Sequence, residues 1–281
     1  MSRHPDVVVV GAGIVGCSTA WELARRGVSV TLVDRGEVSG GTTGLGEGNA
    51  LCSDKDAGPE LELSVAGLKL FDELEDVVGA AARIRRKGAL IVHPEAETWA
   101  GEPARLERLR VAGVRAELLS PEDVRELEPE LTGEIHGALY APDDLQCDPR
   151  AIAGALAAAA ADCGATIRTH TEVKAIEPGA GVRLGDEAFL PAGAVVLAAG
   201  PWSAPLAKTA GLHLPVEPRK GQLTRLRLPR PDPSFLRRKI VDGSYLSSVT
   251  STGAGRQIST VVETTWDGHV IVGSTRERCG F

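Results

Sequence analysis

The hydrophobic pattern of the first 34 residues predicts their local structure. Residues 6–10 form a β-branched run, the glycine-rich turn "GAGIVG" follows, and a helical stretch ends at Gly27. A second apolar run covers residues 28–33 and ends at Asp34. Both runs are continuously apolar instead of alternating, which is typical of a parallel sheet covered on both faces. The order strand, turn, helix, strand therefore predicts one βαβ unit.

Later segments predict further helices and strands of both kinds. Ser120 and Asp148 are each followed by proline and are predicted to cap the N-termini of helices, the second of which is alanine-rich and ends at Gly164. Short strands are expected at 166–170, in "TEVKAIEP" and in "GAVVLAAGPWS". From about Pro215 apolar and polar residues alternate, which predicts antiparallel strands.

Composition and charge exclude several classes of protein. The 281 residues are 43% hydrophobic and carry a formal net charge of −7, so the chain can bury a sizeable core but lacks the basic excess that binds nucleic acid. Asp6 precedes the apolar start, and Glu22 with Arg25 closes it, which argues against a signal peptide and an integral membrane helix. Five cysteines without a CxxC pair indicate reduced thiols, a cytoplasmic location and no metal cluster.

Gly11, Gly13, Gly16 and Asp34 form a dinucleotide-binding fingerprint. The first glycine permits a tight turn, the second lets the backbone approach a pyrophosphate, and the third lets helix and strand pack closely. The N-terminus of the helix then offers backbone N–H groups to the phosphates. Asp34 follows the second strand, where its carboxylate accepts hydrogen bonds from the hydroxyls of the adenosine ribose.

Two further segments distinguish between dinucleotides. The loop "GGTTGLGEGN" at 40–49 follows Asp34, and "VVLAAGPWS" at 195–203 adds a second strand that ends in a glycine turn. Together with "PRKGQL" and "WDGHVIVGSTRERCGF", this ordered set resembles the family of FAD-dependent amine and amino-acid oxidases, the group of D-amino-acid oxidase, glycine oxidase and sarcosine oxidase. The resemblance covers essentially the whole chain, and it implies FAD as the cofactor.

The resemblance also implies roles for individual residues. The loop that passes beside the pyrophosphate and flavin would be formed by Thr42, Thr43, Gly48 and Asn49, and the backbone of Val173 would contact the adenine. Gly200 and Trp202 match the family's "AGPW" turn near the cofactor. With the fingerprint, the predicted cofactor-binding residues are Gly11, Gly13, Gly16, Asp34, Thr42, Thr43, Gly48, Asn49, Val173, Gly200 and Trp202.

The expected fold class is α/β, with mixed α+β character. A Rossmann-like FAD-binding domain with a parallel sheet is predicted at 1–80 and 145–212, interleaved with a mainly antiparallel substrate domain at 81–144 and 213–281. In the family the chain continues past the "GSTRE" turn and returns to the FAD domain, whereas this sequence ends at Phe281. The resemblance therefore leads us to expect that this C-terminal return is missing.

The implied reaction is the removal of a hydride from a carbon that bears an amine, with transfer to the flavin and hydrolysis of the resulting imine. The partners would be a small amine or amino acid and oxygen or another electron acceptor. A cation is needed for the carboxylate of an amino acid, and the candidates are Lys55 and Arg276; Tyr245 is a candidate for a substrate contact. No catalytic base is assigned.

Three alternatives stay open at this point. An FAD enzyme that oxidises a hydroxy acid or a polyol phosphate shares the fingerprint and part of the loop. An NAD-dependent dehydrogenase explains residues 6–34 but gives no purpose to the "GGTT" loop and the "AAGPW" turn. A non-catalytic or truncated FAD-binding component, which could need a partner subunit, is the third reading.

Overall fold

The computed structural model describes residues 4–244 and 257–281, which form two compact units. The first unit consists of Met1–Gly48, Leu74–Arg83 and Cys147–Glu217, and the second of Asn49–Glu73, Ile84–Gln146 and Pro218–Phe281. The sequence prediction placed residues 49–73 with the dinucleotide-binding part, whereas in the structure they pack with the second unit. The reason is burial, because Cys52 and Leu61 belong to a core cluster of that unit.

The first unit is built on a parallel sheet, as predicted. Its strand order is β13-β1-β2-β9, and every neighbouring pair runs parallel. The four strands are β1 (Val7–Val10), β2 (Val30–Val33), β9 (Thr166–Arg168) and β13 (Ala194–Leu197). The central strands β1 and β2 are almost entirely buried, which explains why their sequences are continuously apolar.

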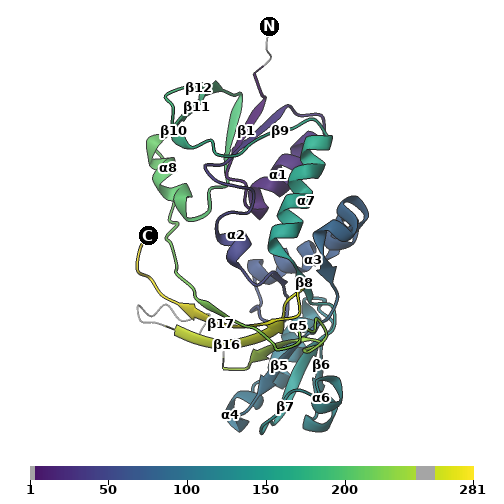
Figure 1. Cartoon of the computed structure of the whole chain (residues 1–281). Helices are drawn as coiled ribbons and strands as arrows, with labels where there is room; N and C mark the ends of the chain where they lie inside the picture. Colours follow the sequence, from purple (N-terminus) through teal and green to yellow (C-terminus); the bar gives the residue numbers. More distant parts are fainter. Residues whose placement is uncertain (1–3, 245–256) are drawn as a thin grey trace. The chain divides into compact units, whose positions relative to one another are not determined.

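Two helices pack side by side in this unit, α1 (Ile14–Ala24) and α7 (Pro149–Asp162) (Figure 1). The predicted cap of α7 is confirmed, because the Asp148 carboxylate accepts hydrogen bonds from the N–H groups of Arg150 and Ala151 at 3.0 and 3.1 Å. Small alanine side chains let α7 approach α1 closely. The helix ends before Gly164, whose φ of +93° suits a glycine C-cap.

The rest of the first unit surrounds this sheet with short elements. An antiparallel sheet of three strands contributes Val173, Val182 and Leu184 to a core shared with Val8 and Val33. The short elements are α2 (Thr42–Leu45), η1 (Gly79–Ala82), β10 (Val173–Glu177), β11 (Gly181–Leu184), β12 (Phe189–Pro191), η2 (Gly200–Trp202) and α8 (Ser203–Thr209).

The second unit is built on a seven-stranded sheet in the order β14-β17-β16-β15-β5-β7-β6. All neighbours are antiparallel except β15 and β5, so the prediction of antiparallel strands in the last third is confirmed. The strands are β5 (Ala89–His93), β6 (Glu117–Leu119), β7 (Gly137–Ala141), β14 (Leu223–Leu226), β15 (Lys239–Asp242), β16 (Gln257–Thr264) and β17 (Val270–Arg276).

Helices and one small sheet complete the second unit. Helix α6 begins with the predicted capping box, in which the Ser120 hydroxyl accepts the Asp123 N–H at 3.2 Å and the Asp123 carboxylate accepts the Ser120 N–H at 3.1 Å. The remaining elements are β3 (Asn49–Ala50), α3 (Pro59–Val78), β4 (Ile84–Arg85), α4 (Ala96–Trp99), α5 (Glu102–Val111), α6 (Pro121–Leu127) and β8 (Leu145–Cys147). The boundary between the units falls inside α3, after Glu73. Within residues 4–244 and 257–281, no helix has both the length and the apolarity to cross a bilayer.

Candidate functional site

A cavity of about 950 Å³ lies within the first unit, beside the carboxyl ends of β1, β2 and β13. This is the edge at which open parallel sheets bind their ligands, and the volume suits a dinucleotide cofactor. The structure brings together most of the predicted cofactor-binding residues around it. Those that line the cavity are Gly11, Gly13, Asp34, Thr42, Thr43, Val173, Gly200 and Trp202.

The glycine turn between β1 and α1 has no room for side chains. Gly11 has a φ of +108°, and a Cβ atom there would lie 2.4 Å from the carbonyl oxygen of Ala198. A Cβ atom on Gly16 would lie 1.7 Å from the carbonyl oxygen of Gly11. Gly16 does not line the cavity but packs α1 against the turn. The missing side chains thus let the turn pack against Ala198 and α1, and Gly11 and Gly13 line the cavity with backbone alone.

The N-terminus of α1 forms part of the cavity wall. Gly13, Ile14 and Val15 line the cavity, and no side chain caps the helix at Gly13. The Ile14 N–H donates to Thr43 Oγ1 at 3.1 Å, which joins the helix to α2. The dipole of a helix favours an anion at such a position.

Asp34 is held at the end of β2 by the backbone. Its Oδ2 accepts the Ala12 N–H at 2.7 Å, and its Oδ1 accepts the Gly36 N–H at 2.8 Å. A carboxylate has about four lone-pair sites, so both oxygens can accept further hydrogen bonds from a ligand. The hydroxyls of a ribose are suitable donors.

A tryptophan and an arginine form another part of the wall. Arg35 Cζ lies 4.0 Å from the centroid of the Trp202 ring, which is a cation–π contact. Gly41 packs near the same ring, since a Cβ atom there would lie 3.9 Å from it. The sequence prediction included Trp202 but missed Arg35, although this arginine directly follows Asp34.

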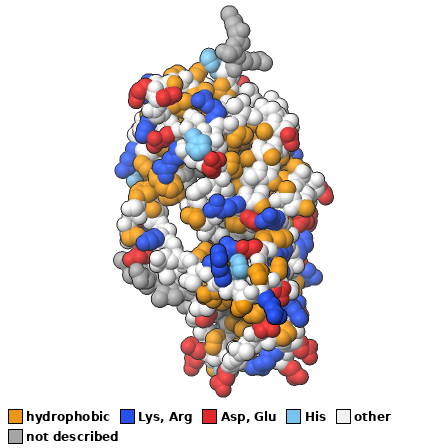
Figure 2. Space-filling view, in the orientation of Figure 1, with side chains coloured by type: hydrophobic (Ala, Val, Ile, Leu, Met, Phe, Trp, Pro, Cys, Tyr) orange, Lys and Arg blue, Asp and Glu red, His pale blue; other side chains and the backbone are white. Residues whose placement is uncertain are grey.

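A histidine and a lysine lie beside acidic side chains at the cavity. His170 Nε2 lies 2.6 Å from Glu37 Oε1, and Lys174 Nζ lies 2.8 Å from Glu172 Oε2. Figure 2 shows basic and acidic side chains close together on the visible face of the described residues. In the described ranges, His, Cys, Asp and Glu side chains form no group of three or more that suits a metal ion.

Gly48 and Asn49 were predicted beside the cofactor, and the structure places them where the chain enters the second unit. A Cβ atom on Gly48 would lie 1.9 Å from the Cys147 carbonyl oxygen, and the Gly48 carbonyl accepts the Cys147 N–H at 2.7 Å. Asn49 begins β3 and pairs with Gln146 of β8. Neither residue lines the cavity. The close approach of the Cys147 backbone explains why residue 48 is a glycine.

The substrate candidates lie in the second unit or outside the described residues. Lys55 Nζ lies 3.1 Å from Asp54 Oδ1 and 3.4 Å from Glu60 Oε1. Burial lowers the pKa of the Lys55 ammonium, but the Asp54 and Glu60 carboxylates outweigh it and raise the pKa above its ordinary value. A substrate carboxylate would have to compete with both acids. Arg276 ends β17, and Tyr245 lies outside the described residues.

A buried carboxylate supports the turn that carries Lys55. Asp144 accepts the Cys52 N–H at 2.8 Å and the Ser53 hydroxyl at 2.5 Å, while Arg105 donates to the Ser53 carbonyl at 3.1 Å. Burial raises the pKa of Asp144 to about 6, although its hydrogen bonds act in the opposite direction. Burial and the nearby Asp144 also raise the pKa of the Cys52 thiol to about 12, so this thiol is not ionised near neutral pH.

Asp144 is expected to give the chain an unusual dependence of stability on pH. Its native pKa of about 6 lies above the ordinary value of 3.8, so the folded state holds the proton more tightly than the unfolded chain. The contribution of this proton to the free energy of unfolding is fully present below the ordinary pKa. It is lost as the pH rises through about 6, a decrease of about 3 kcal/mol. Asp144→Asn should remove this change, measured by urea unfolding between about pH 4 and pH 7.

Asp143→Asn is the matched control for this prediction. Asp143 is the adjacent residue, and its hydrogen bond with Arg115 lowers its pKa. The two variants should therefore change the pH profile differently, with only Asp144→Asn removing the loss of stability toward pH 6. Identical profiles for the parent chain and Asp144→Asn would contradict the expectation.

The fold and the cavity define a dinucleotide-binding protein of the Rossmann type. The chain belongs to the FAD dependent oxidoreductase (DAO) family, whose model matches residues 6–281. It is 30% identical over 240 residues to glycine oxidase of Geobacillus kaustophilus, covering 82% of this chain and 64% of that protein. The family resemblance predicted from the sequence is thereby confirmed, together with its cofactor.

Other relatives differ in their named activities. The chain is 31% identical over 242 residues to anaerobic glycerol-3-phosphate dehydrogenase subunit A1 of Haloferax volcanii, covering 80% of this chain and 41% of that protein. The crystal structure of glycine oxidase from Geobacillus kaustophilus superposes with a TM-score of 0.84 at 26% identity, covering 99% of this chain and 73% of that one. The chain thus spans 41% and 64% of the lengths of these two curated relatives.

Proposed function

We propose that this chain oxidises an amine or amino acid at the carbon that bears the nitrogen, giving an imine that hydrolyses in water. FAD, when bound, supplies the acceptor for the hydride. The observation that carries the proposal is the cavity of the first unit, in which the glycine turn, the N-terminus of α1 and Asp34 face one space. The 30% identity to glycine oxidase supports an amine substrate.

The residues around the cavity fit a flavin dinucleotide. Gly11 and Gly13 leave the backbone bare for the diphosphate, and Asp34 has lone pairs available for the ribose hydroxyls. The Val173 backbone at the start of β10 would contact the adenine. Further lining residues are Thr42, Thr43, Gly200 and Trp202. Gly48 and Asn49 stay proposed contacts of the cofactor, on the strength of the family pattern alone.

The first unit would therefore hold FAD and the second unit would bind the substrate. Lys55 and Arg276 are the proposed cations for a substrate carboxylate, both located in the second unit. Oxygen or another carrier would reoxidise the flavin. A partner subunit is a further proposal. It is supported by the relative from Haloferax volcanii, which is named as subunit A1 of an enzyme.

A second candidate function is the oxidation of a polyol phosphate. It is favoured by the 31% identity to a subunit of anaerobic glycerol-3-phosphate dehydrogenase. Lys55 would serve a phosphate as well as a carboxylate, and its pairs with Asp54 and Glu60 would have to open for either group. The amine function stays the first proposal because the chain covers 64% of glycine oxidase but 41% of the glycerol-3-phosphate dehydrogenase subunit.

An anaerobic reduction experiment distinguishes the two substrates. The chain is loaded with FAD, freed of excess cofactor and mixed with glycine, sarcosine or glycerol 3-phosphate, while the visible flavin absorbance is followed. We expect the amines to bleach the flavin and to release an aldehyde or oxo acid, and Lys55→Met to raise the amine concentration needed. Bleaching by glycerol 3-phosphate alone would establish the second candidate. Retained colour with every substrate would contradict both.

A further inference from the structure

The basic side chains at the cavity differ in what they contact. Four of them line it, and three have an acidic or aromatic partner: Lys174 pairs with Glu172, His170 faces Glu37, and Arg35 stacks on Trp202. The fourth is Arg150. Among the described residues, its guanidinium has one protein partner, the carbonyl of Gly44, to which Nε donates at 2.9 Å. Its two terminal nitrogens therefore keep their donors available for a ligand.

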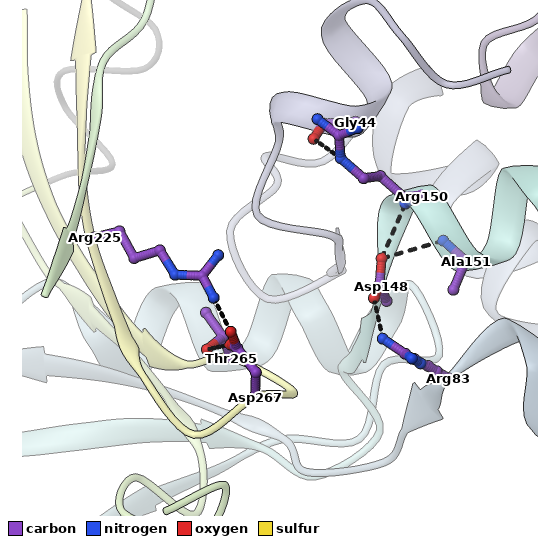
Figure 3. Close-up of polar contacts among 8 residues, drawn as sticks. All are labelled: Gly44, Arg83, Asp148, Arg150, Ala151, Arg225, Thr265 and Asp267. Atoms are coloured by element: carbon purple, nitrogen blue, oxygen red, sulfur yellow. Dashed lines mark hydrogen bonds and ion pairs between the residues drawn. The ribbon is translucent and has the colours of Figure 1, made fainter. Parts of the chain in front are cut away.

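Arg150 is fixed at both ends. Its backbone N–H is held by the carboxylate of Asp148 in the first turn of α7, and its side chain extends to Gly44 in α2 (Figure 3). A Cβ atom on Gly44 would lie 3.2 Å from Cγ and Cζ of Arg150 and 2.1 Å from the Ser39 carbonyl oxygen. A glycine at 44 thus makes room for the arginine to lie against the loop.

This position is next to the part of the cavity that favours an anion. Gly44 follows Thr43, whose hydroxyl accepts the N–H of Ile14 in the first turn of α1. The N-terminus of a helix attracts negative charge. A guanidinium carries five N–H donors in a planar fork that matches phosphate oxygens, and Nε uses one of them for Gly44. The other four belong to the terminal nitrogens.

We propose that Arg150 is a binding residue for the diphosphate of the dinucleotide in this cavity, acting together with the N-terminus of α1. The inference rests on the proposed function, because it takes the ligand of the cavity to be FAD. It also assigns a role to the first turn of α7, a segment 106 residues away from Gly44 in the sequence. The local pattern around residue 150 predicts a helix start and gives no sign of this contact.

Three ligands and three variants test the role. Apoprotein is titrated with FAD, ADP and adenosine, at low and at high salt, by calorimetry or by quenching of protein fluorescence. Arg150→Gln keeps a donor for the Gly44 carbonyl but loses the charge, Arg150→Lys keeps the charge without the fork, and Arg83→Gln is the matched control. Arg83 is an exposed arginine that pairs with Asp148 and does not line the cavity (Figure 3).

We expect Arg150→Gln to weaken the binding of FAD and ADP by about 10-fold or more, the loss expected for a charge-assisted hydrogen bond. Adenosine, which lacks phosphates, should bind the variant and the parent chain equally. The salt dependence of ADP binding should decrease in Arg150→Gln. Arg150→Lys should retain part of the affinity, and Arg83→Gln should bind all three ligands as the parent does.

Two results would overturn the inference while the proposed function stands. Equal losses for FAD, ADP and adenosine in Arg150→Gln would make Arg150 a support of the loop and not a phosphate ligand. Unchanged affinities for all three would remove any role in binding. If the parent chain binds neither FAD nor ADP, the proposed function itself fails, and this inference fails with it.

Discussion

Replacing Gly16 by alanine is expected to abolish FAD retention and to lower the free energy of unfolding by about 3 kcal/mol or more. A Cβ atom at this position would lie 1.7 Å from the carbonyl oxygen of Gly11. The obstacle is backbone, so no side-chain rotation can relieve it. Either α1 moves away from β1 or the turn opens, and both changes displace the N–H groups that face the cavity.

Gly154→Ala is the matched control for this substitution. Gly154 lies inside α7 of the same unit, and a Cβ atom there meets nothing within 4 Å. Alanine is the better helix former, so this variant should gain about 0.5–1 kcal/mol. Urea unfolding and the flavin bound after gel filtration measure both variants. Parent-like stability and FAD content in Gly16→Ala would show that the turn is looser than described.

Replacing Asp34 by alanine should weaken FAD binding by about 100-fold, since hydrogen bonds to a charged group contribute about 1.5–3 kcal/mol each. The variant removes the acceptor of two backbone N–H groups, those of Ala12 and Gly36, as well as the acceptor proposed for the ribose. Adenosine carries the same ribose, so its binding should weaken too. The titrations designed for Arg150 therefore distinguish the proposed ribose contact of Asp34 from the proposed diphosphate contact of Arg150. Arg150→Gln is expected to leave adenosine binding unchanged.

Asp34→Asn provides the graded comparison. The amide oxygen can accept from Ala12 or Gly36, while the amide nitrogen faces the other N–H as a second donor. An intermediate affinity for FAD and adenosine is expected, together with stability between that of the parent and of Asp34→Ala. Equal dissociation constants for all three proteins would contradict a role of this carboxylate in binding.

Local chemistry explains which parts of the fold were predictable. The strands β1 and β2 are buried on both faces, so their sequences are uniformly apolar, and the turn between them needs glycine for steric reasons that act within a few residues. The caps at Ser120 and Asp148 use side chains adjacent to the N–H groups they satisfy. Interactions between residues a few positions apart can therefore be predicted from the sequence.

Long-range packing explains what was missed. Arg150 and Gly44 are 106 residues apart in the chain, and Arg35 meets Trp202 only because β2 and η2 end at the same cavity. No local pattern contains this information. The ion pairs of Lys55 are of the other kind, because Asp54 and Glu60 are near Lys55 in the sequence. Their positions could have been used to predict that the charge of Lys55 is already paired.

Segment 49–73 shows a second limit of local patterns. Apolar residues recur at helical spacing between Leu61 and Leu74, which predicts a buried helix face but not the core that buries it. Leu61 packs with Ile91 and Leu139 of the seven-stranded sheet, and this contact assigns the segment to the second unit. The sequence contains the amphipathic pattern alone, so the partner sheet had to be seen in the structure.

Whether the cavity of the first unit holds FAD is tested most directly by reconstitution. The purified chain is incubated with FAD, passed through a gel-filtration column, and its visible spectrum is recorded before and after denaturation. We predict flavin bands that co-elute with the folded chain in a one-to-one ratio and that denaturation releases, and a marked loss of these bands in Gly16→Ala and Asp34→Ala. A chain that is folded by circular dichroism but stays colourless after incubation with FAD would contradict this.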